Sequence, residues 1–193
     1  TTDSQKLSPL TTGSTRVVRL NGEDDWDEWR DAARRLLAAR IPPNTIVWQT
    51  GVETTDLFAQ NNSDLPPLPQ SELRVPKAFP DLAKSALLHS DPARFSLVYQ
   101  LLWLSSEHPS LLGDHAHPLV RRVMMMAKAV RRDIHKMHAF VRFREVEASE
   151  GDGLSGSRFI AWFEPEHHIV RASAGFFVRR FTQMSWSILT PAL

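Results

Sequence analysis

The order of apolar and polar residues along the chain predicts five short strands and five helices. The predicted strands cover residues 15–20, 45–49, 139–147, 158–163 and 186–189, and the predicted helices cover 24–40, 80–90, 92–107, 118–138 and 165–183. The first strand, helix and strand form a β-α-β start, and the chain closes with a hairpin, a helix and a strand. This order predicts an α+β fold, in which a mostly antiparallel sheet is packed by about five helices.

Turn and breaker residues divide the chain further. Residues 1–14 are polar and lack the apolar centre of a signal peptide, so we expect a disordered N-terminal tail. Residues 50–80 include LPPLP, Pro76 and Pro80, which exclude both a helix and a central strand and predict a mobile connection. Asp91 is placed to cap the helix that starts at Pro92. We therefore expect one α+β domain over residues 15–193.

The predicted helix at 118–138 has one apolar and one basic side. At 100° per residue its apolar stripe holds Leu119, Val123, Met126, Ala127, Val130, Ile134, Met137 and, just beyond it, Val141. The opposite side holds Arg121, Lys128, Arg131, Arg132, His135 and Lys136. Only Asp133 relieves the positive charge within this helix. The amphipathic pattern predicts that one side packs on the core and that the basic side faces solvent.

Charge spacing separates this helix from an ordinary solvated one. The helix at 24–40 pairs Asp27 with Arg30, whereas the helix at 118–138 pairs Lys128 with Arg132, and Arg132 with Lys136. Each like-charged pair costs about 0.2–0.5 kcal/mol in an isolated helix. Two interpretations stay open: carboxylates from elsewhere in the fold neutralise the basic side, or an anionic partner does.

Composition favours the second interpretation. Residues 1–118 have a net charge of −4, whereas residues 119–193 hold 12 Lys and Arg against 7 Asp and Glu. Ten of those 12 cations are Arg, the side chain that binds phosphate in a bidentate fashion. We predict DNA, single-stranded or distorted, as the partner. The predicted phosphate contacts are Arg121, Lys128, Arg131, Arg132, Lys136, Arg142, Arg144, Arg179 and Arg180, with His135 and Trp186 nearer the bases.

Other chemistry has weaker support in the sequence. The chain has no Cys, which excludes disulfides, Cys-ligated zinc and iron–sulfur clusters within it and is typical of a cytoplasmic protein. No apolar run approaches the roughly 20 residues of a membrane span. The His and Glu spacing matches no zinc motif, so we expect no metal and no cofactor in this chain. Glu164, beside Pro165, is expected to cap the last helix.

Two alternatives to a binding domain remain. The first is a nucleic-acid-processing enzyme, with Asp133, His135, Glu164 and His167 as the candidate acid, base or metal-binding groups. This requires the four side chains to converge in one cleft. The second is a protein-interaction adaptor, in which the basic side docks on an acidic partner protein.

Several motifs carry a resemblance that covers most of the chain from about residue 15. They are DPARFSLVYQLLW (91–103), VRRDIHKMHAFVRFRE (130–145), FIAWFEPEHHIVR (159–171), FFVRRF (176–181) and MSWSILTP (184–191). The chain resembles the domain of unknown function of bacterial DNA-metabolism and DNA-repair proteins. That domain occurs alone, encoded beside a radical-SAM protein. It also occurs as the N-terminal half of fusions to a family-4-like (UdgX-type) uracil-DNA glycosylase.

The resemblance implies a function rather than a set of catalytic residues. It implies a DNA-binding accessory domain that works with a uracil-DNA glycosylase domain in cis or with a radical-SAM protein in trans. A glycosylase half would bring its own uracil pocket and iron–sulfur cysteines, and neither occurs in this chain. Because the family is expected to continue beyond Pro191, we expect the sequence to be an N-terminal domain.

Overall fold

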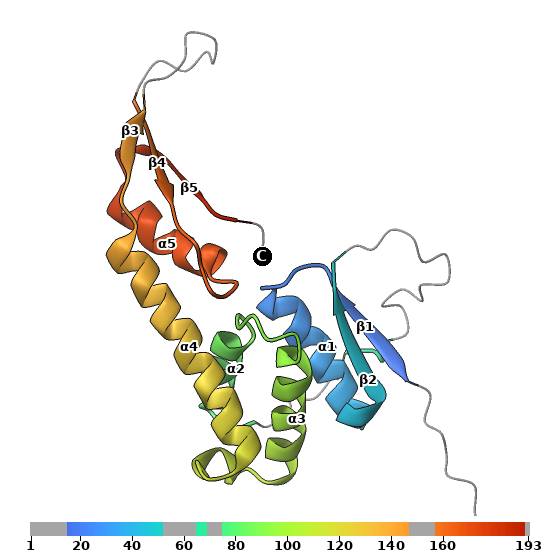
Figure 1. The fold of residues 1–193 in the computed structure, drawn as a ribbon. Coiled ribbons are helices and arrows are strands. Elements are labelled where there is room, and N and C mark those ends of the chain that lie inside the picture. The colour runs from blue at the N-terminus through green and yellow to red at the C-terminus, as the bar shows by residue number, and fades with distance from the viewer. Residues whose placement is uncertain (1–14, 52–64, 69–74, 147–156, 192–193) are drawn as a thin grey trace, which may run out of the picture.

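A computed structural model gives the fold and describes residues 15–51, 65–68, 75–146 and 157–191 (Figure 1). The strands are β1 (Arg16–Leu20), β2 (Ile46–Thr50), β3 (Arg144–Val146), β4 (Arg158–Trp162) and β5 (Ser185–Leu189). The helices are α1 (Trp26–Ala38), α2 (Phe79–Ala86), α3 (Arg94–Glu107), α4 (Pro118–Phe140) and α5 (Val170–Arg180), with short 3₁₀ turns at Pro43–Thr45 and Leu111–Gly113. The predicted α+β class, the β-α-β start and the C-terminal hairpin-helix-strand are confirmed.

The pairing of the strands corrects the expected single, mostly antiparallel sheet. The described strands form two separate sheets, β1-β2 and β3-β4-β5. β1 and β2 are parallel because α1 crosses between them, and β4 and β5 are parallel because α5 does the same. Only the hairpin partners β3 and β4 run antiparallel. Each sheet therefore packs with its own crossover helix.

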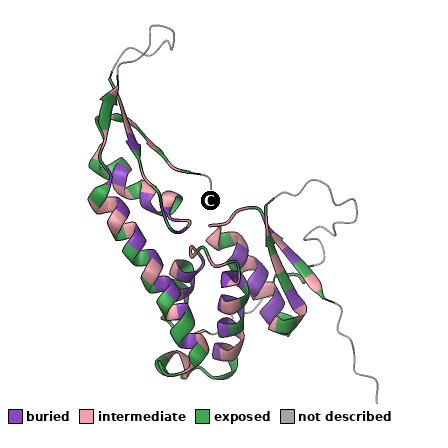
Figure 2. Ribbon diagram, in the orientation of Figure 1, coloured by how far each residue is buried: buried purple, intermediate pink, exposed green. Residues whose placement is uncertain are grey.

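Helix α4 joins two hydrophobic cores. The first core includes β1, β2, α1, α2, α3 and the first half of α4 up to Ala127, and we call these elements the N-terminal lobe. The second core begins at Val130 on the same helix and includes β4, β5 and α5, and we call these elements, with β3, the C-terminal lobe. Figure 2 shows the buried side of α4 passing from one lobe to the other. The predicted apolar stripe is confirmed at Val123, Met126, Ala127, Val130 and Met137.

The boundaries of some elements differ from the predictions. Helix α4 continues to Phe140, so β3 starts at Arg144 rather than at residue 139. Helix α5 starts at Val170 instead of residue 165, because the segment before it runs along α4 as an irregular turn. Asp91 does not cap the next helix as predicted, because α3 begins at Arg94 with Ala93 as its N-cap; Asp91 Oδ1 instead accepts a hydrogen bond from the Ala93 amide at 2.8 Å in the turn before the helix.

Some expectations lie outside the described residues. The tail at 1–14 does, as do most of the connection at 50–80 and most of the loop at 149–157. Of the described residues of that connection, 65–68 and 75–78 contain no helix or strand, whereas Thr50 ends β2 and Phe79 and Pro80 begin α2. None of the helices in the described part of the chain has the length and apolar character needed to cross a membrane.

Candidate functional site

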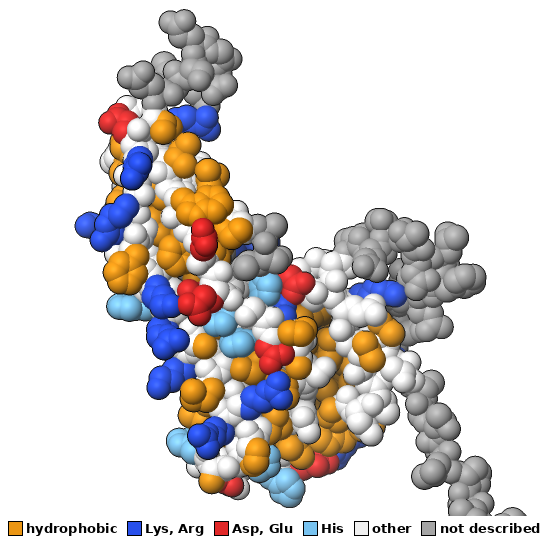
Figure 3. Space-filling view, in the orientation of Figure 1, with side chains coloured by type: hydrophobic (Ala, Val, Ile, Leu, Met, Phe, Trp, Pro, Cys, Tyr) orange, Lys and Arg blue, Asp and Glu red, His pale blue; other side chains and the backbone are white. Residues whose placement is uncertain are grey.

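The basic side of α4 is exposed along the whole helix. Arg121, Lys128, Arg131, Arg132 and His135 are all exposed, and Lys136 is partly exposed. Figure 3 shows Lys and Arg side chains following one edge of the molecule over α4. We call Arg121, Lys128, Arg131, Arg132, His135 and Lys136 the basic face. The structure therefore brings together the cations that the helical periodicity placed on one side.

The one acid of this helix does not neutralise the basic face. Asp133 is only 3% exposed and lies on the buried side of α4. Its Oδ2 accepts hydrogen bonds from the backbone amides of Glu166 and His167, at 2.9 and 3.0 Å. Its charge is thus directed toward the segment before α5 and away from Arg131 and Arg132.

Carboxylates reach the basic face at one place. Glu166 binds Lys136 at 2.6 Å, and this hydrogen bond, with the Lys136 charge, lowers the pKa of Glu166. Within the described residues, no carboxylate forms an ion pair with Arg121, Lys128, Arg131 or Arg132. Among the described residues after position 118, N-terminal acids pair with Arg122, held by Asp91 at 3.0 Å, and with Arg171, held by Asp24 at 3.4 Å, and both lie outside the basic face.

The other predicted phosphate contacts lie on the C-terminal lobe and are exposed. Arg142 follows α4, Arg144 starts β3, and Arg179 and Arg180 end α5. Arg142 donates to the carbonyl oxygens of Ala139 and Val141, at 2.7 and 3.0 Å, which directs its guanidinium back toward the end of α4. Among the described residues these four Arg have no carboxylate partner, so the uncompensated charge extends beyond α4.

Trp186 and Phe143 occupy the core of the C-terminal lobe. Their ring centroids lie 5.8 Å apart, and both rings contact Phe177, which is 1% exposed. Trp186 was predicted to lie near the bases, but its position is explained by packing. Phe140, at the end of α4, is by contrast 67% exposed.

The four candidate catalytic residues lie in different environments. Asp133 is buried and bound to backbone amides, whereas His135 is exposed on the basic face. Glu164 accepts a hydrogen bond from Trp162 Nε1 at 2.9 Å, so it does not cap α5 as expected. His167 is buried beside Asp133, which accepts its backbone amide, but the other two candidates lie elsewhere, so the structure does not bring all four side chains together in one cleft.

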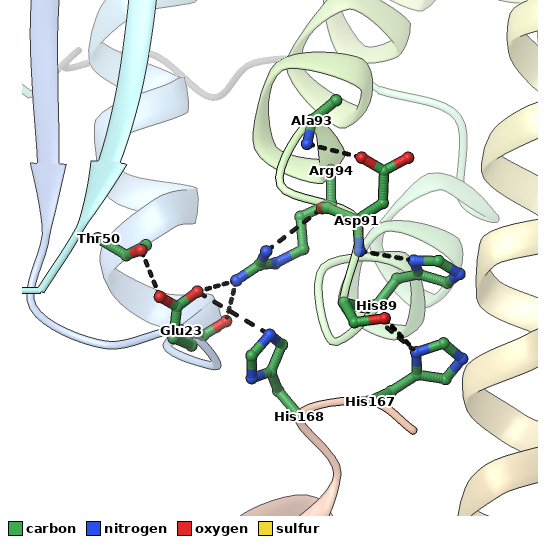
Figure 4. Close-up of polar contacts among 9 residues, drawn as sticks. Glu23, Thr50, His89, Asp91, Ala93, Arg94, His167 and His168 are labelled. Carbon is green, nitrogen blue, oxygen red and sulfur yellow. Dashed lines mark hydrogen bonds and ion pairs between the residues drawn. The ribbon is translucent and has the colours of Figure 1, made fainter. Parts of the chain in front are cut away.

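A different polar cluster lies at the junction of the two lobes (Figure 4). Glu23 comes from the turn before α1, and its carboxylate accepts hydrogen bonds from the Thr50 hydroxyl and the Arg94 guanidinium. Arg94 is 3% exposed, and the Glu23 carboxylate links it on α3 to Thr50 at the end of β2. His168, from the C-terminal lobe, places its Nε2 atom 4.0 Å from the same carboxylate.

Three histidines complete this junction. The rings of His89 and His167 lie 4.2 Å apart, and His167 Nδ1 accepts a hydrogen bond from the Ser90 amide at 3.3 Å. The Nε2 atom of His167 is buried without a hydrogen-bond partner among the described residues. Burial lowers the pKa of both His89 and His168, and the Arg94 charge contributes to the shift of His168. His89 and His168 are therefore neutral imidazoles near neutral pH.

An open cavity of about 260 Å³ adjoins this junction. Its lining residues are Glu23, Trp48, Thr50, Ser90, Pro92, Arg94, Phe95 and His168. Burial alone would raise the pKa of Glu23, but the hydrogen bonds from Thr50 and Arg94 and the Arg94 charge lower it overall. An ionised carboxylate and a neutral imidazole are both acceptors, so the cavity can accept hydrogen bonds from a small polar molecule.

Sequence reasoning missed this junction because its members are scattered. Glu23, Arg94 and His168 are separated by more than 70 residues at each step and share no motif. One signal was available: Arg94 and Glu23 lie beside helix N-termini, where polar side chains commonly bind unpaired backbone groups. Within the described part of the chain, no three His, Asp or Glu side chains are arranged to hold a metal ion.

Comparisons with known proteins identify one family. The family model described as "Domain of unknown function (DUF4130)" matches residues 92–192, slightly more than half of the chain. The match covers α3, the whole basic face and the C-terminal lobe, and begins after β1, α1 and β2. No curated protein and no solved structure matches the chain.

Proposed function

The chain belongs to the DUF4130 family of domains of unknown function, and we propose that it is a DNA-binding accessory domain in DNA repair or metabolism. The observation that carries this proposal is the exposed basic face, in which no carboxylate of the described residues forms an ion pair with Arg121, Lys128, Arg131 or Arg132. Like charges at helical spacing destabilise the free protein, and an anionic partner removes that cost. Nucleic acid is the anionic partner that presents charge at regular spacing along a line.

The spacing of the cations supports a ligand that runs along α4. Arg121, Lys128 and Arg132 lie on one side of the helix at intervals of seven and four residues. These intervals correspond to rises of about 10 and 6 Å. Phosphates of one DNA strand advance about 3.4 Å each along the duplex axis, so every second or third phosphate meets a cation. Arg142 and Arg144 extend the same contacts beyond the end of the helix.

The proposed partners follow from the resemblance. In this proposal the domain holds opened or damaged DNA for a uracil-DNA glycosylase domain in cis or for a radical-SAM protein in trans. An enzyme built on Asp133, His135, Glu164 and His167 is disfavoured, because these side chains lie in separate environments. An adaptor that binds an acidic protein through the basic face is the remaining alternative.

One binding screen tests the proposal. Fluorescence anisotropy of the full chain is measured with labelled single-stranded and duplex oligonucleotides, each with and without uracil, at about 50 mM salt. Saturable binding supports the proposal, and a preference for uracil supports the link to a glycosylase. The absence of binding to every oligonucleotide overturns it. Nuclease-insensitive capture of an acidic glycosylase domain, without oligonucleotide binding, would establish the adaptor instead.

A further inference from the structure

The sheet β3-β4-β5 has two unlike faces. Alternation along each strand places Ala161, Trp186 and Ile188 on the inner face, which packs against α4 and α5 in the second core. The register places Ile160, Trp162 and Leu189 on the outer face. Arg144 lies opposite Ile160 in the antiparallel pair and therefore also belongs to the outer face.

The outer face leaves a large aromatic side chain in solvent. Trp162 is 58% exposed, and its strand neighbour Leu189 is 49% exposed. The two residues are paired in register and form one apolar patch with Ile160, which is partly buried. An indole left in solvent beside other apolar side chains is typical of a binding surface.

Trp162 is also held in position. Its Nε1 atom donates a hydrogen bond to Glu164 Oε1 at 2.9 Å, which satisfies the only polar group of the indole and restricts its rotation. A ring fixed in this way loses little conformational freedom when a ligand stacks on it. The adjacent Glu164 carboxylate repels phosphate, so an uncharged part of a ligand must contact the ring.

Positive charge lies at the other side of the same patch. Arg144 is exposed and has no carboxylate partner among the described residues. A ligand that covers the outer face thus meets an uncharged aromatic surface at Trp162. It also meets a cation at Arg144, on the neighbouring strand β3. Single-stranded nucleic acid offers both bases and phosphates, and its unpaired bases are free to stack.

We propose that the outer face of β3-β4-β5 is a stacking platform for unpaired bases, with Trp162 as the stacking residue and Arg144 as a phosphate contact. This inference rests on the proposed function and specifies its ligand as single-stranded. The basic face of α4 binds phosphates of both single-stranded and duplex DNA, whereas Trp162 contacts only bases that have left the duplex. Trp162 thereby takes the position near the bases that was predicted for Trp186.

Two substitutions at Trp162 test the platform in the full chain. Anisotropy is measured with a labelled 12-mer single strand and with the blunt duplex of the same length. Trp162→Ala is expected to weaken single-strand binding by about 5- to 150-fold, the range seen for loss of one stacked base. Trp162→Phe is expected to keep most of the affinity, because it retains a stacking ring. Duplex affinity is expected to stay within about twofold for both variants, since duplex bases stack on one another.

The matched control is Val47→Ala, which removes an exposed apolar side chain from β2 in the N-terminal lobe, away from the basic face and the outer face. It is expected to change single-strand affinity by less than about twofold. Circular dichroism and the urea midpoint confirm that each variant is folded.

Each failure has its own signature. The platform is overturned if Trp162→Ala leaves single-strand affinity unchanged, or lowers single-strand and duplex affinity equally, while substitutions on the basic face still weaken binding. In those cases the proposed DNA-binding function stands. Absence of oligonucleotide binding by the unsubstituted chain overturns both proposals. If Trp162→Ala instead abolishes self-association in sedimentation and leaves oligonucleotide affinity unchanged, the outer face binds a second copy and the platform is rejected.

Discussion

The carboxylate of Asp133 accepts a hydrogen bond from the backbone amide of His167 at 3.0 Å, across 34 residues of sequence. The same oxygen accepts the Glu166 amide at 2.9 Å, so one buried side chain fixes the segment between β4 and α5 on the buried side of α4. This contact sets where Glu166 and α5 lie relative to the basic face. It also removes the only acid of α4 from the neighbourhood of its cations.

Loss of the Asp133 carboxylate should destabilise the fold. Asp133→Ala leaves the buried His167 amide and the partly buried Glu166 amide without an acceptor, and we expect the free energy of unfolding to fall by about 2–4 kcal/mol. Asp133→Asn keeps an acceptor oxygen of the same size and should lose less than half as much. Urea denaturation at pH 7 measures both. A loss below about 0.5 kcal/mol for Asp133→Ala would contradict this structural role.

The Glu23–Arg94 pair should matter for stability because Arg94 is buried. Glu23→Ala leaves the guanidinium without its carboxylate, and we expect a loss of about 2–4 kcal/mol after allowance for the partial exposure of Glu23. The double variant Glu23→Ala/Arg94→Met should recover part of this loss, because no buried charge remains. Asp27→Ala, in an exposed pair with Arg30, is the matched control and should change stability by less than about 0.5 kcal/mol.

Stability should fall as the solution is acidified, beginning near the ordinary His pKa of 6.5. Burial lowers the folded-state pKa of His89, His138 and His168, so the unfolded chain binds more protons once the pH drops below about 6.5. The His contribution is complete above that pH and is lost as pH falls toward the folded values. The lowered pKa values of Glu23 and Asp91 add a second loss below about pH 4.5.

Urea midpoints from pH 8 to pH 4 measure this dependence. His168→Gln should flatten the profile between about pH 6.5 and pH 5, because it removes one of the groups that the unfolded state protonates first. A stability that is constant from pH 8 to pH 5, or that rises on acidification, would show that these imidazoles are not buried in their neutral form.

Removal of Glu166 should strengthen DNA binding. Glu166→Gln takes away the carboxylate that binds Lys136, and it frees Lys136 and the neighbouring Arg132 for phosphate. We expect a gain of about two- to fivefold in affinity at about 50 mM salt, consistent with a surface ion pair worth up to about 1 kcal/mol. Asp27→Asn removes a negative charge from α1 and should leave affinity unchanged. Unchanged or weaker binding by Glu166→Gln would place the ligand away from Lys136.

Local patterns predicted most of the elements and the basic face. Periodicity places Val123 and Met137 on one side of α4 and Arg121 and Arg132 on the other, and these are properties of one continuous helix. Long-range contacts were not predicted. The Glu166 amide binds Asp133 of α4 and not Glu164, two residues away in the sequence. This pairing depends on how α4 and the C-terminal lobe pack together. The parallel pairing of β4 with β5 depends equally on where α5 returns the chain.

The aromatic residues show the same limit. Trp186 and Trp162 are both strand tryptophans in the C-terminal region, and their sequence neighbours do not reveal which one faces solvent. Register decides it, since Trp186 pairs with Phe159 on the inner face and Trp162 pairs with Leu189 on the outer face. A change of one residue in register would exchange the two faces.

The salt dependence of oligonucleotide binding tests the uncompensated basic face most directly. Arg131→Gln/Arg132→Gln removes two unpaired cations of α4, and Arg30→Gln removes a cation that Asp27 and Asp31 already hold. The logarithm of the binding constant is measured against the logarithm of salt concentration for both variants and for the unsubstituted chain.

We predict a steep negative slope for the unsubstituted chain and for Arg30→Gln. The double variant should bind more weakly, and its slope should be shallower by about 1.4–1.8, since each lost phosphate contact removes about 0.7–0.9. Binding that does not respond to salt, or an identical slope for the double variant and the unsubstituted chain, would contradict a phosphate-binding role for the basic face.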